Sequence, residues 1–241
     1  MTEYTLAIDG STYAGSVALL SNDSVIAERA LEDRGIPSRA GRDELMLPVV
    51  AECIAAGGIT VRDISRVVCG AGPGGFTGLR VAASIAKGLA VGSASPLFAV
   101  SSLLLTLAAA PGTIAPARYL STIPAMRGEL FVLEVIVDDH GGVRALGEPR
   151  LLAEEAAGDL ARAAGVTMAG PGAQLDLRPH ARGVAKLLAS VMADGPRHID
   201  TWEPAYGRLA EAQVRWEAVH GRPLPTEAIG RTPADRGRGA L

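Results

Sequence analysis

The sequence predicts a mixed α/β protein, and three observations lead to this fold class. Short stretches rich in β-branched and apolar residues open the chain at residues 4–9, 15–20 and 25–30, with turn residues between them. Two further stretches, residues 64–69 and 96–100, alternate with segments of helical periodicity. A glycine-rich segment connects the first of these two strands directly to a helix. The resulting order, βββαβαβα, favours a mixed sheet covered by helices.

The composition is typical of a globular protein with a sizeable core. The chain has 241 residues, of which 48% are hydrophobic and 20% charged, and its net charge is −3. This charge does not favour direct nucleic-acid binding, and no run of eighteen apolar residues predicts a membrane span. The first residues lack the basic region of a signal peptide, so we expect a cytoplasmic protein. Cys53 and Cys69 lie in apolar stretches and are expected to be buried, free thiols.

The first three strands are expected to form an antiparallel meander, because Asn22-Asp23 is typical of a hairpin turn. Residues 31–42 carry Gly35, Pro37 and Gly41 and predict a loop. A helix is expected from Asp43 to about Ala56, ending at Gly57-Gly58. Its Pro48 must lie in the first turn or bend the helix.

The glycine-rich segment, Gly70 to Gly78, contains five glycines and a proline in nine residues, which excludes a regular element. Thr77 is expected to cap the helix that follows, which runs to about Gly92. The segment lacks the Lys-Ser/Thr pair of a P-loop and the acidic residue that follows a dinucleotide-binding motif. Two interpretations remain: a tight, close-packed connection, or an anion site at the start of a helix.

The second half of the chain predicts a further set of strands and helices. A strand pair is expected at residues 119–123 and 130–137, a short strand at 167–169, and helices at 153–164, 184–192 and 206–220. Pro111-Gly112 and Pro116 indicate a boundary. We therefore expect an N-terminal lobe over residues 1–110, a smaller α/β lobe over 111–220, and a loose tail over 221–241.

Two stretches carry a family resemblance. They are the opening Leu6 to Thr12 with Ser16 to Leu19, and the loop Gly72, Pro73, Gly74, Gly75, Phe76, Thr77, Gly78, Leu79 and Arg80. Together they resemble the TsaB (YeaZ) family of bacterial threonylcarbamoyladenosine biosynthesis proteins. The similarity extends to Leu47-Pro48, Gly128-Glu129 and Pro204 to Arg208, and covers residues 4 to about 215.

The resemblance implies an actin-like, sugar-kinase-like fold (ASKHA, ribonuclease H-like) with two related α/β lobes. It implies a non-catalytic subunit that acts in the modification of adenosine 37 of tRNA. Its partners would be the transferase TsaD, a paralogue that carries the metal, and the ATPase TsaE. No cofactor would be bound by the chain itself, tRNA would be reached only through the complex, and a homodimer is also compatible with the family.

Three positions depart from the family pattern. Gly10 stands where the family usually has threonine, and Arg42 stands near the place of a common histidine. The family's Asp-Ala-Arg before Gly-Glu corresponds here to Pro124-Ala125-Met126. These departures weaken a ligand role for the second-lobe loop and leave the glycine segment untouched.

Enzymes of related type need residues that this sequence largely lacks. A metallopeptidase, to which older naming (glycoprotease, M22) links the family, needs clustered ligands, and none of the four histidines is paired at helical spacing. The alternative function is an ATP-dependent phosphotransferase of the sugar-kinase type, for which Asp9 and Ser11 would be the remnant of a phosphate site. Asp9 could equally form hydrogen bonds with local amides in a turn. Arg80 could pair with a local acid or face a partner or phosphate.

Two helices offer a surface for a partner. The helix from Asp43 and the helix from Thr77 both have more apolar or small positions than one buried face requires. We expect a four-helix interface with a related molecule, although packing within the chain is the alternative. The residues assigned to it are Leu45, Val49, Ile54, Ala82, Ala86 and Leu89.

Overall fold

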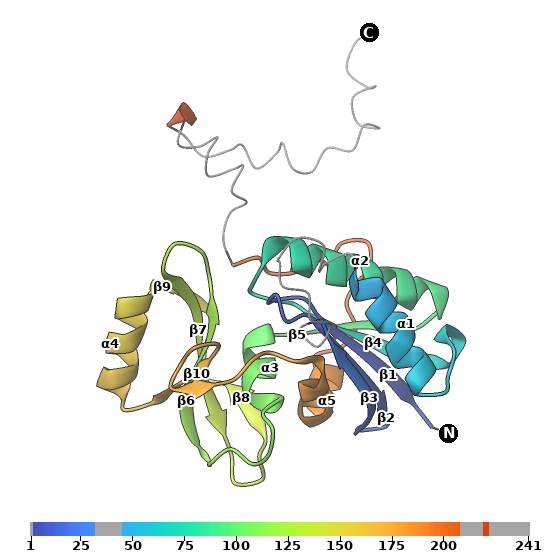
Figure 1. Ribbon diagram of the computed structural model, residues 1–241, viewed down its shortest axis with the longest axis horizontal. Coiled ribbons are helices and arrows are strands. Elements are labelled where there is room, and N and C mark those ends of the chain that lie inside the picture. The colour runs from blue at the N-terminus through green and yellow to red at the C-terminus, as the bar shows by residue number, and fades with distance from the viewer. Residues whose placement is uncertain (1, 32–44, 208–218, 222–241) are drawn as a thin grey trace. The chain divides into compact units, whose positions relative to one another are not determined.

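The computed structural model of the chain describes residues 2–31, 45–207 and 219–221. The described residues up to Gly207 form one compact unit built on two mixed β-sheets with helices (Figure 1). The predicted loop at 31–42, most of the predicted last helix and the predicted tail fall largely or wholly outside the described residues. The predicted lobe boundaries remain predictions.

The first sheet has the strand order β3-β2-β1-β4-β5. The strands β1 (Tyr4–Asp9), β2 (Ser16–Ser21) and β3 (Ser24–Ala30) form the predicted antiparallel meander. The strands β4 (Ile64–Gly70) and β5 (Leu97–Val100) extend it in parallel. Because Ile8 pairs with Cys69, Asp9 and Gly70 meet at the same edge of the sheet.

Two helices cover one face of this sheet. The helices α1 (Met46–Ala56) and α2 (Phe76–Gly92) share one hydrophobic cluster with strand residues such as Leu6, Ile8 and Val67. Pro48 lies in the first turn of α1, where its missing N–H removes no helical hydrogen bond. Cys53 and Cys69 are buried and free, as predicted. Trp202 packs against the same cluster.

The opposite face of the first sheet faces the second sheet across a shared core. The helices α3 (Ser102–Ala108) and α5 (Val184–Ala193), with the 3₁₀ turn η4 (Ala181–Gly183), contribute to this core. It joins first-sheet residues such as Val68 and Phe98 to second-sheet residues such as Phe131. One continuous core therefore spans both sheets.

The second sheet has the order β11-β10-β6-β7-β8, with β9 also pairing with β7. Its predicted members are β6 (Ala117–Pro124), β7 (Glu129–Val137) and β10 (Thr167–Gly170). The strands β8 (Val143–Ala145), β9 (Arg150–Ala153) and β11 (Leu175–Asp176) were not predicted, because two to four residues show no periodicity. The helix α4 (Glu154–Ala164) packs on β6 and β7 through Ala157 and Ala161. None of the described helices is long and apolar enough to cross a membrane.

Candidate functional site

The glycine segment connects β4 to α2 and is held from three sides by backbone hydrogen bonds. The Ala71 amide donates to the Val100 carbonyl at 2.7 Å, and the Gly75 amide donates to the Ser11 carbonyl at 2.7 Å. The Ser102 amide donates to the Gly72 carbonyl at 2.9 Å. The peptide bond between Gly72 and Pro73 is cis. The loop is thereby fixed to the β1–β2 turn and to the start of α3.

Glycine is required here because backbones approach each other closely. A side chain at Gly74 would collide with the backbone of Ser11, and one at Gly10 would collide with the carbonyl of Gly78 in α2. Gly10, a departure from the family pattern, thus lets the first turn of α2 approach the β1–β2 turn. This geometry supports the close-packed connection of the two interpretations left open by the sequence.

Asp9 is fully buried beneath this loop and accepts three hydrogen bonds. Its Oδ1 accepts from the Ser102 hydroxyl at 2.6 Å, and its Oδ2 accepts from the Ser11 hydroxyl at 2.7 Å and the Ser11 amide at 3.3 Å. Burial raises the pKa of the Asp9 carboxyl, against the opposing effect of these hydrogen bonds. A carboxylate enclosed in this way is a poor ligand for the magnesium ion of a phosphate site, and it behaves as the turn-forming acid that the sequence allowed.

The start of α2 differs from the prediction. The helix begins at Phe76, and Gly75 is the capping residue, without a side-chain hydrogen bond. Thr77 therefore lies inside the first turn and is not the N-cap. Gly75 is the last residue with an extended backbone, so the loop ends and the helix begins two residues earlier than the position of the Thr77 hydroxyl suggested.

The first turn of α2 meets the end of the compact unit. The ring of Phe76 lies 4.7 Å from that of Tyr206, and the Arg80 guanidinium lies 4.1 Å above the Phe76 ring. The Arg80 Nε donates to the Tyr206 hydroxyl at 3.4 Å. The structure thus joins two motifs of the resemblance that are 126 residues apart in the chain. The sequence did not predict this contact, because nothing local relates Tyr206 to the loop.

The partner residues proposed from the sequence need correction. Val49, Ala82 and Ala86 have no exposed surface, and Ile54 is also buried, because these side chains pack on the sheet within this chain. Leu45 and Leu89 are only partly buried. The packing alternative therefore applies to the small residues of α2, and a partner would contact the opposite side of the helix.

The outward side of these two helices carries many apolar or small residues beside the charged Glu52 and Arg80. The apolar or small residues include Leu47, Pro48, Ala51 and Ala55 on α1, and Ser84, Gly88 and Val91 on α2. We call these seven residues the α1–α2 face. Leu47 is 56% exposed and Val91 is 67% exposed, which is unusual for large apolar side chains on a helix packed against a sheet.

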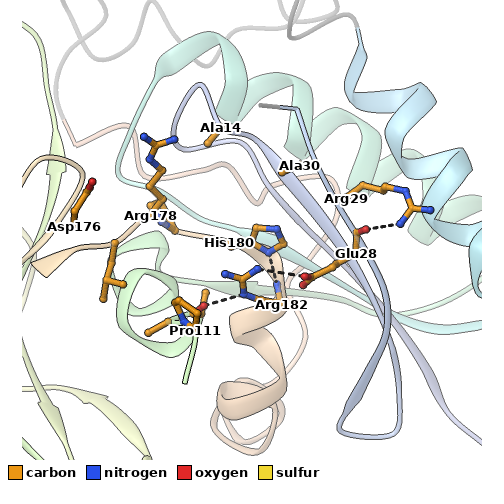
Figure 2. Close-up of a pocket in the computed structure, with 13 residues that line it drawn as sticks. Ala14, Glu28, Arg29, Ala30, Pro111, Asp176, Arg178, His180 and Arg182 are labelled. Atoms are coloured by element: carbon orange, nitrogen blue, oxygen red, sulfur yellow. Dashed lines mark hydrogen bonds and ion pairs between the residues drawn. The ribbon is translucent and has the colours of Figure 1, made fainter. Parts of the chain in front are cut away.

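A pocket of about 410 Å³ lies elsewhere, between the end of β3, the end of α3 and residues 176–182 (Figure 2). Its charged lining includes Glu28, Arg29, Asp176, Arg178 and Arg182, none of which the sequence singled out. Arg182 donates to the Ala109 carbonyl at 2.9 Å and pairs with Glu28 at 3.3 Å. These contacts fasten the segment before η4 to β3 and α3.

The described part of the chain contains no group of three or more His, Cys, Asp or Glu side chains that could hold a metal ion. His140 and His198 are exposed, and His180 is half-buried and accepts a hydrogen bond from the Arg182 amide at 3.1 Å. His180 thus acts as the capping residue of η4.

Comparisons with known proteins agree with the sequence resemblance. The family model described as TsaD, tRNA N6-adenosine threonylcarbamoyltransferase, matches residues 25–187. The tRNA threonylcarbamoyladenosine biosynthesis protein TsaB of Escherichia coli is 36% identical over 136 residues, 56% of each chain. The chain therefore spans only about half the length of this relative. The Bacillus subtilis protein of the same name is 29% identical over 239 residues, covering 88% of this chain and 96% of that protein.

Solved structures extend the likeness to the fold. YeaZ from Pseudomonas aeruginosa superposes with a TM-score of 0.69 at 26% identity, over 85% of this chain and 99% of that chain. The two sheets and their helices thus have the actin-like α/β arrangement that the resemblance implied.

Proposed function

Because the chain belongs to the TsaB (YeaZ) family, we propose that it is a non-catalytic subunit of the tRNA threonylcarbamoyladenosine modification machinery. In this role it binds a TsaD-like transferase and stabilises it in an active form. The proposal includes a cytoplasmic location, contact with tRNA only through the complex, and a TsaE-like ATPase as a further partner.

The observation that carries the proposal is the α1–α2 face. Two helices lie on the outer side of one sheet and leave Leu47 and Val91 largely exposed, with small residues between them. Exposed apolar side chains on two neighbouring helices are typical of a protein–protein interface. Ala51, Ser84 and Gly88 would let the helices of a second molecule approach closely.

A related molecule suits this surface. Two helices on one sheet can meet the equivalent two helices of a paralogue about a pseudo-twofold axis and form a four-helix interface. A homodimer would use the same surface and compete with the paralogue. The six residues assigned from the sequence would then support the helices, and the exposed residues would make the contact.

The absence of catalysis is supported by the glycine loop. Asp9 is enclosed by Ser11 and Ser102, so the acid that a kinase of this fold would use is already engaged. In the second-lobe turn, Pro124 ends β6 where the family has an acid. These two features argue against the phosphotransferase alternative.

The test is a calorimetric titration of the chain with a TsaD-like protein. The Val91→Arg variant should melt close to wild type, because its side chain is exposed, and should bind at least tenfold more weakly. Leu146→Arg is the matched control, since Leu146 is 38% exposed on the second-sheet side, and it should bind like wild type.

Two outcomes would contradict the proposal. One is a wild-type chain that does not bind the TsaD-like protein, or a Val91→Arg variant with unchanged affinity. The other is threonylcarbamoyl transfer to tRNA by the purified chain alone.

A further inference from the structure

The cluster of Phe76, Arg80 and Tyr206 is an ordered, positively charged site on the surface. The Arg80 guanidinium stacks on Phe76 at 4.1 Å and lies 5.6 Å from the centre of the Tyr206 ring. Its Nε is taken by the Tyr206 hydroxyl. Two rings and one hydrogen bond therefore hold an exposed arginine in one orientation.

Arg80 lacks an acidic partner in the described part of the chain. The ion pairs of that part join other arginines, such as Arg66 with Glu3 and Arg118 with Glu134. The contacts of Arg80 are the two rings and the tyrosine hydroxyl. An arginine that is fixed in place and has no carboxylate partner among the described residues is suited to receive one from another molecule, because its planar fork matches a carboxylate.

The cluster adjoins the α1–α2 face. Residues 76, 80, 84, 88 and 91 follow one another at intervals of three or four, which places them along one side of α2. Phe76, Arg80, Ser84, Gly88 and Val91 are all exposed, and the buried residues Leu79, Ala82, Ala83, Ala86 and Ala90 occupy the other side. A partner lying along the exposed side would reach Arg80 at the N-terminal end of the helix.

Tyr206 is held at this place by the backbone around it. The Ala205 amide donates to the Ala71 carbonyl at 2.8 Å. A side chain at Gly207 would collide with Phe131 and would crowd Pro73. The segment Pro204 to Gly207 therefore crosses the glycine loop closely, and the loop fixes the position of the Tyr206 ring relative to α2.

We propose that Phe76, Arg80 and Tyr206 form a carboxylate-binding corner of the partner interface, which receives an Asp or Glu side chain of the TsaD-like protein. This inference rests on the proposed function. The occupant is an acidic side chain because Arg80 is the exposed cation of α2 and has no carboxylate partner among the described residues. Lys87, the other cation of α2, lies over the Trp202 ring at 5.9 Å.

An RNA backbone fits this corner less well. Binding to phosphates usually relies on several arginines and lysines on one surface, and the chain carries a net charge of −3. A single fixed arginine beside apolar residues instead provides orientation and specificity in a protein interface.

The experiment measures binding of the full-length chain to the TsaD-like protein at low and high salt. Arg80→Glu should weaken binding at least tenfold at low salt and should reduce its salt dependence. Arg80→Lys should recover only part of the affinity, because lysine keeps the charge but loses the fork and the stacking. Arg144→Glu is the control for net charge, since Arg144 is exposed on β8, and it should bind like wild type.

A charge swap identifies the partner residue. Asp or Glu to Lys variants of the TsaD-like protein are tested against Arg80→Glu, and one of them should restore binding. Arg80→Glu with wild-type affinity, while Val91→Arg fails to bind, would overturn this inference and leave the proposed function intact. Unchanged protein binding with weakened tRNA binding by the complex would also overturn it and assign the corner to RNA. A wild-type chain that does not bind the TsaD-like protein would overturn both.

Discussion

At the scale of single residues, Asp9 shows how burial and hydrogen bonding oppose each other. Burial raises the pKa of its carboxyl above the ordinary 3.8, and the bonds from Ser102 and Ser11 lower it. Because the first effect is larger, the folded chain holds this proton more tightly than the unfolded chain. The stability that Asp9 contributes is therefore fully present below pH 3.8 and is lost as pH rises through the folded-state pKa.

This sign gives a prediction for Asp9→Asn. The free energy of unfolding of wild type minus that of the variant should grow as pH falls from 8 towards 4, by at most about 1.4 kcal/mol per pH unit. Other carboxyls titrate in both proteins and cancel in the difference. Urea unfolding of both proteins at four pH values measures this difference in the free energy of unfolding. If wild type instead lost stability relative to Asp9→Asn on acidification, the hydrogen bonds would outweigh burial.

Gly74 gives a second prediction at this scale. A methyl group there would meet the backbone of Ser11, whose carbonyl also accepts from Gly75. Gly74→Ala should therefore lower the free energy of unfolding by about 1–3 kcal/mol. Gly88→Ala is the matched control, because open space surrounds that position on α2, and it should stabilise by up to about 1 kcal/mol. Denaturant unfolding measures the stability of both variants. A Gly74→Ala variant that is more stable than Gly88→Ala would contradict the prediction.

At the scale of the element, α2 is divided into a buried and an exposed side. Ala86→Leu should lower the free energy of unfolding by about 1–3 kcal/mol, because Ala86 has no exposed surface and the helix packs closely on β1 and β4. Ser84→Leu places the same side chain on the exposed side and should change the free energy of unfolding by less than about 0.5 kcal/mol. Thermal melting compares the two variants, and equal effects would contradict a buried Ala86 and an exposed Ser84.

The same helix shows where sequence analysis succeeds and where it stops. Its existence and length follow from the apolar periodicity, and the glycine loop before it follows from composition. Which of its small residues face inwards does not follow, because alanine and glycine are acceptable on either side. The contact of Arg80 with Tyr206 also cannot be predicted from the sequence, because it depends on how two segments far apart in the chain pack together.

At the scale of the whole molecule, the two sheets share one core. The cluster that contains Ala7, Val68 and Phe98 of the first sheet also contains Phe131 and Val135 of the second. Since loss of packing on one side removes contacts from the other, we expect the two sheets to unfold together. The lobe boundary predicted near residue 110 would then separate the two sheets in the sequence, but the lobes would not fold independently.

The buried thiols allow this to be tested. Cys53 and Cys69 lie with the first sheet, and burial raises the pKa of both thiols, that of Cys53 to about 11, so a thiol reagent reacts only after opening. Phe131→Ala lies in the second sheet and should lower the free energy of unfolding by about 3–5 kcal/mol. Labelling of both cysteines, followed by mass spectrometry, should then accelerate on the order of a hundredfold or more, by the same factor for each.

Met126→Ala is the control for that experiment, because Met126 is exposed at the β6–β7 hairpin and its loss should leave labelling unchanged. Labelling of Phe131→Ala at the wild-type rate, with unfolding of the second sheet visible by circular dichroism, would contradict a shared unfolding step. The two sheets would then open separately, and the boundary near residue 110 would be a true domain boundary. A faster rate at Cys53 alone would instead show local opening of α1, since Cys69 lies in β4, between β1 and β5.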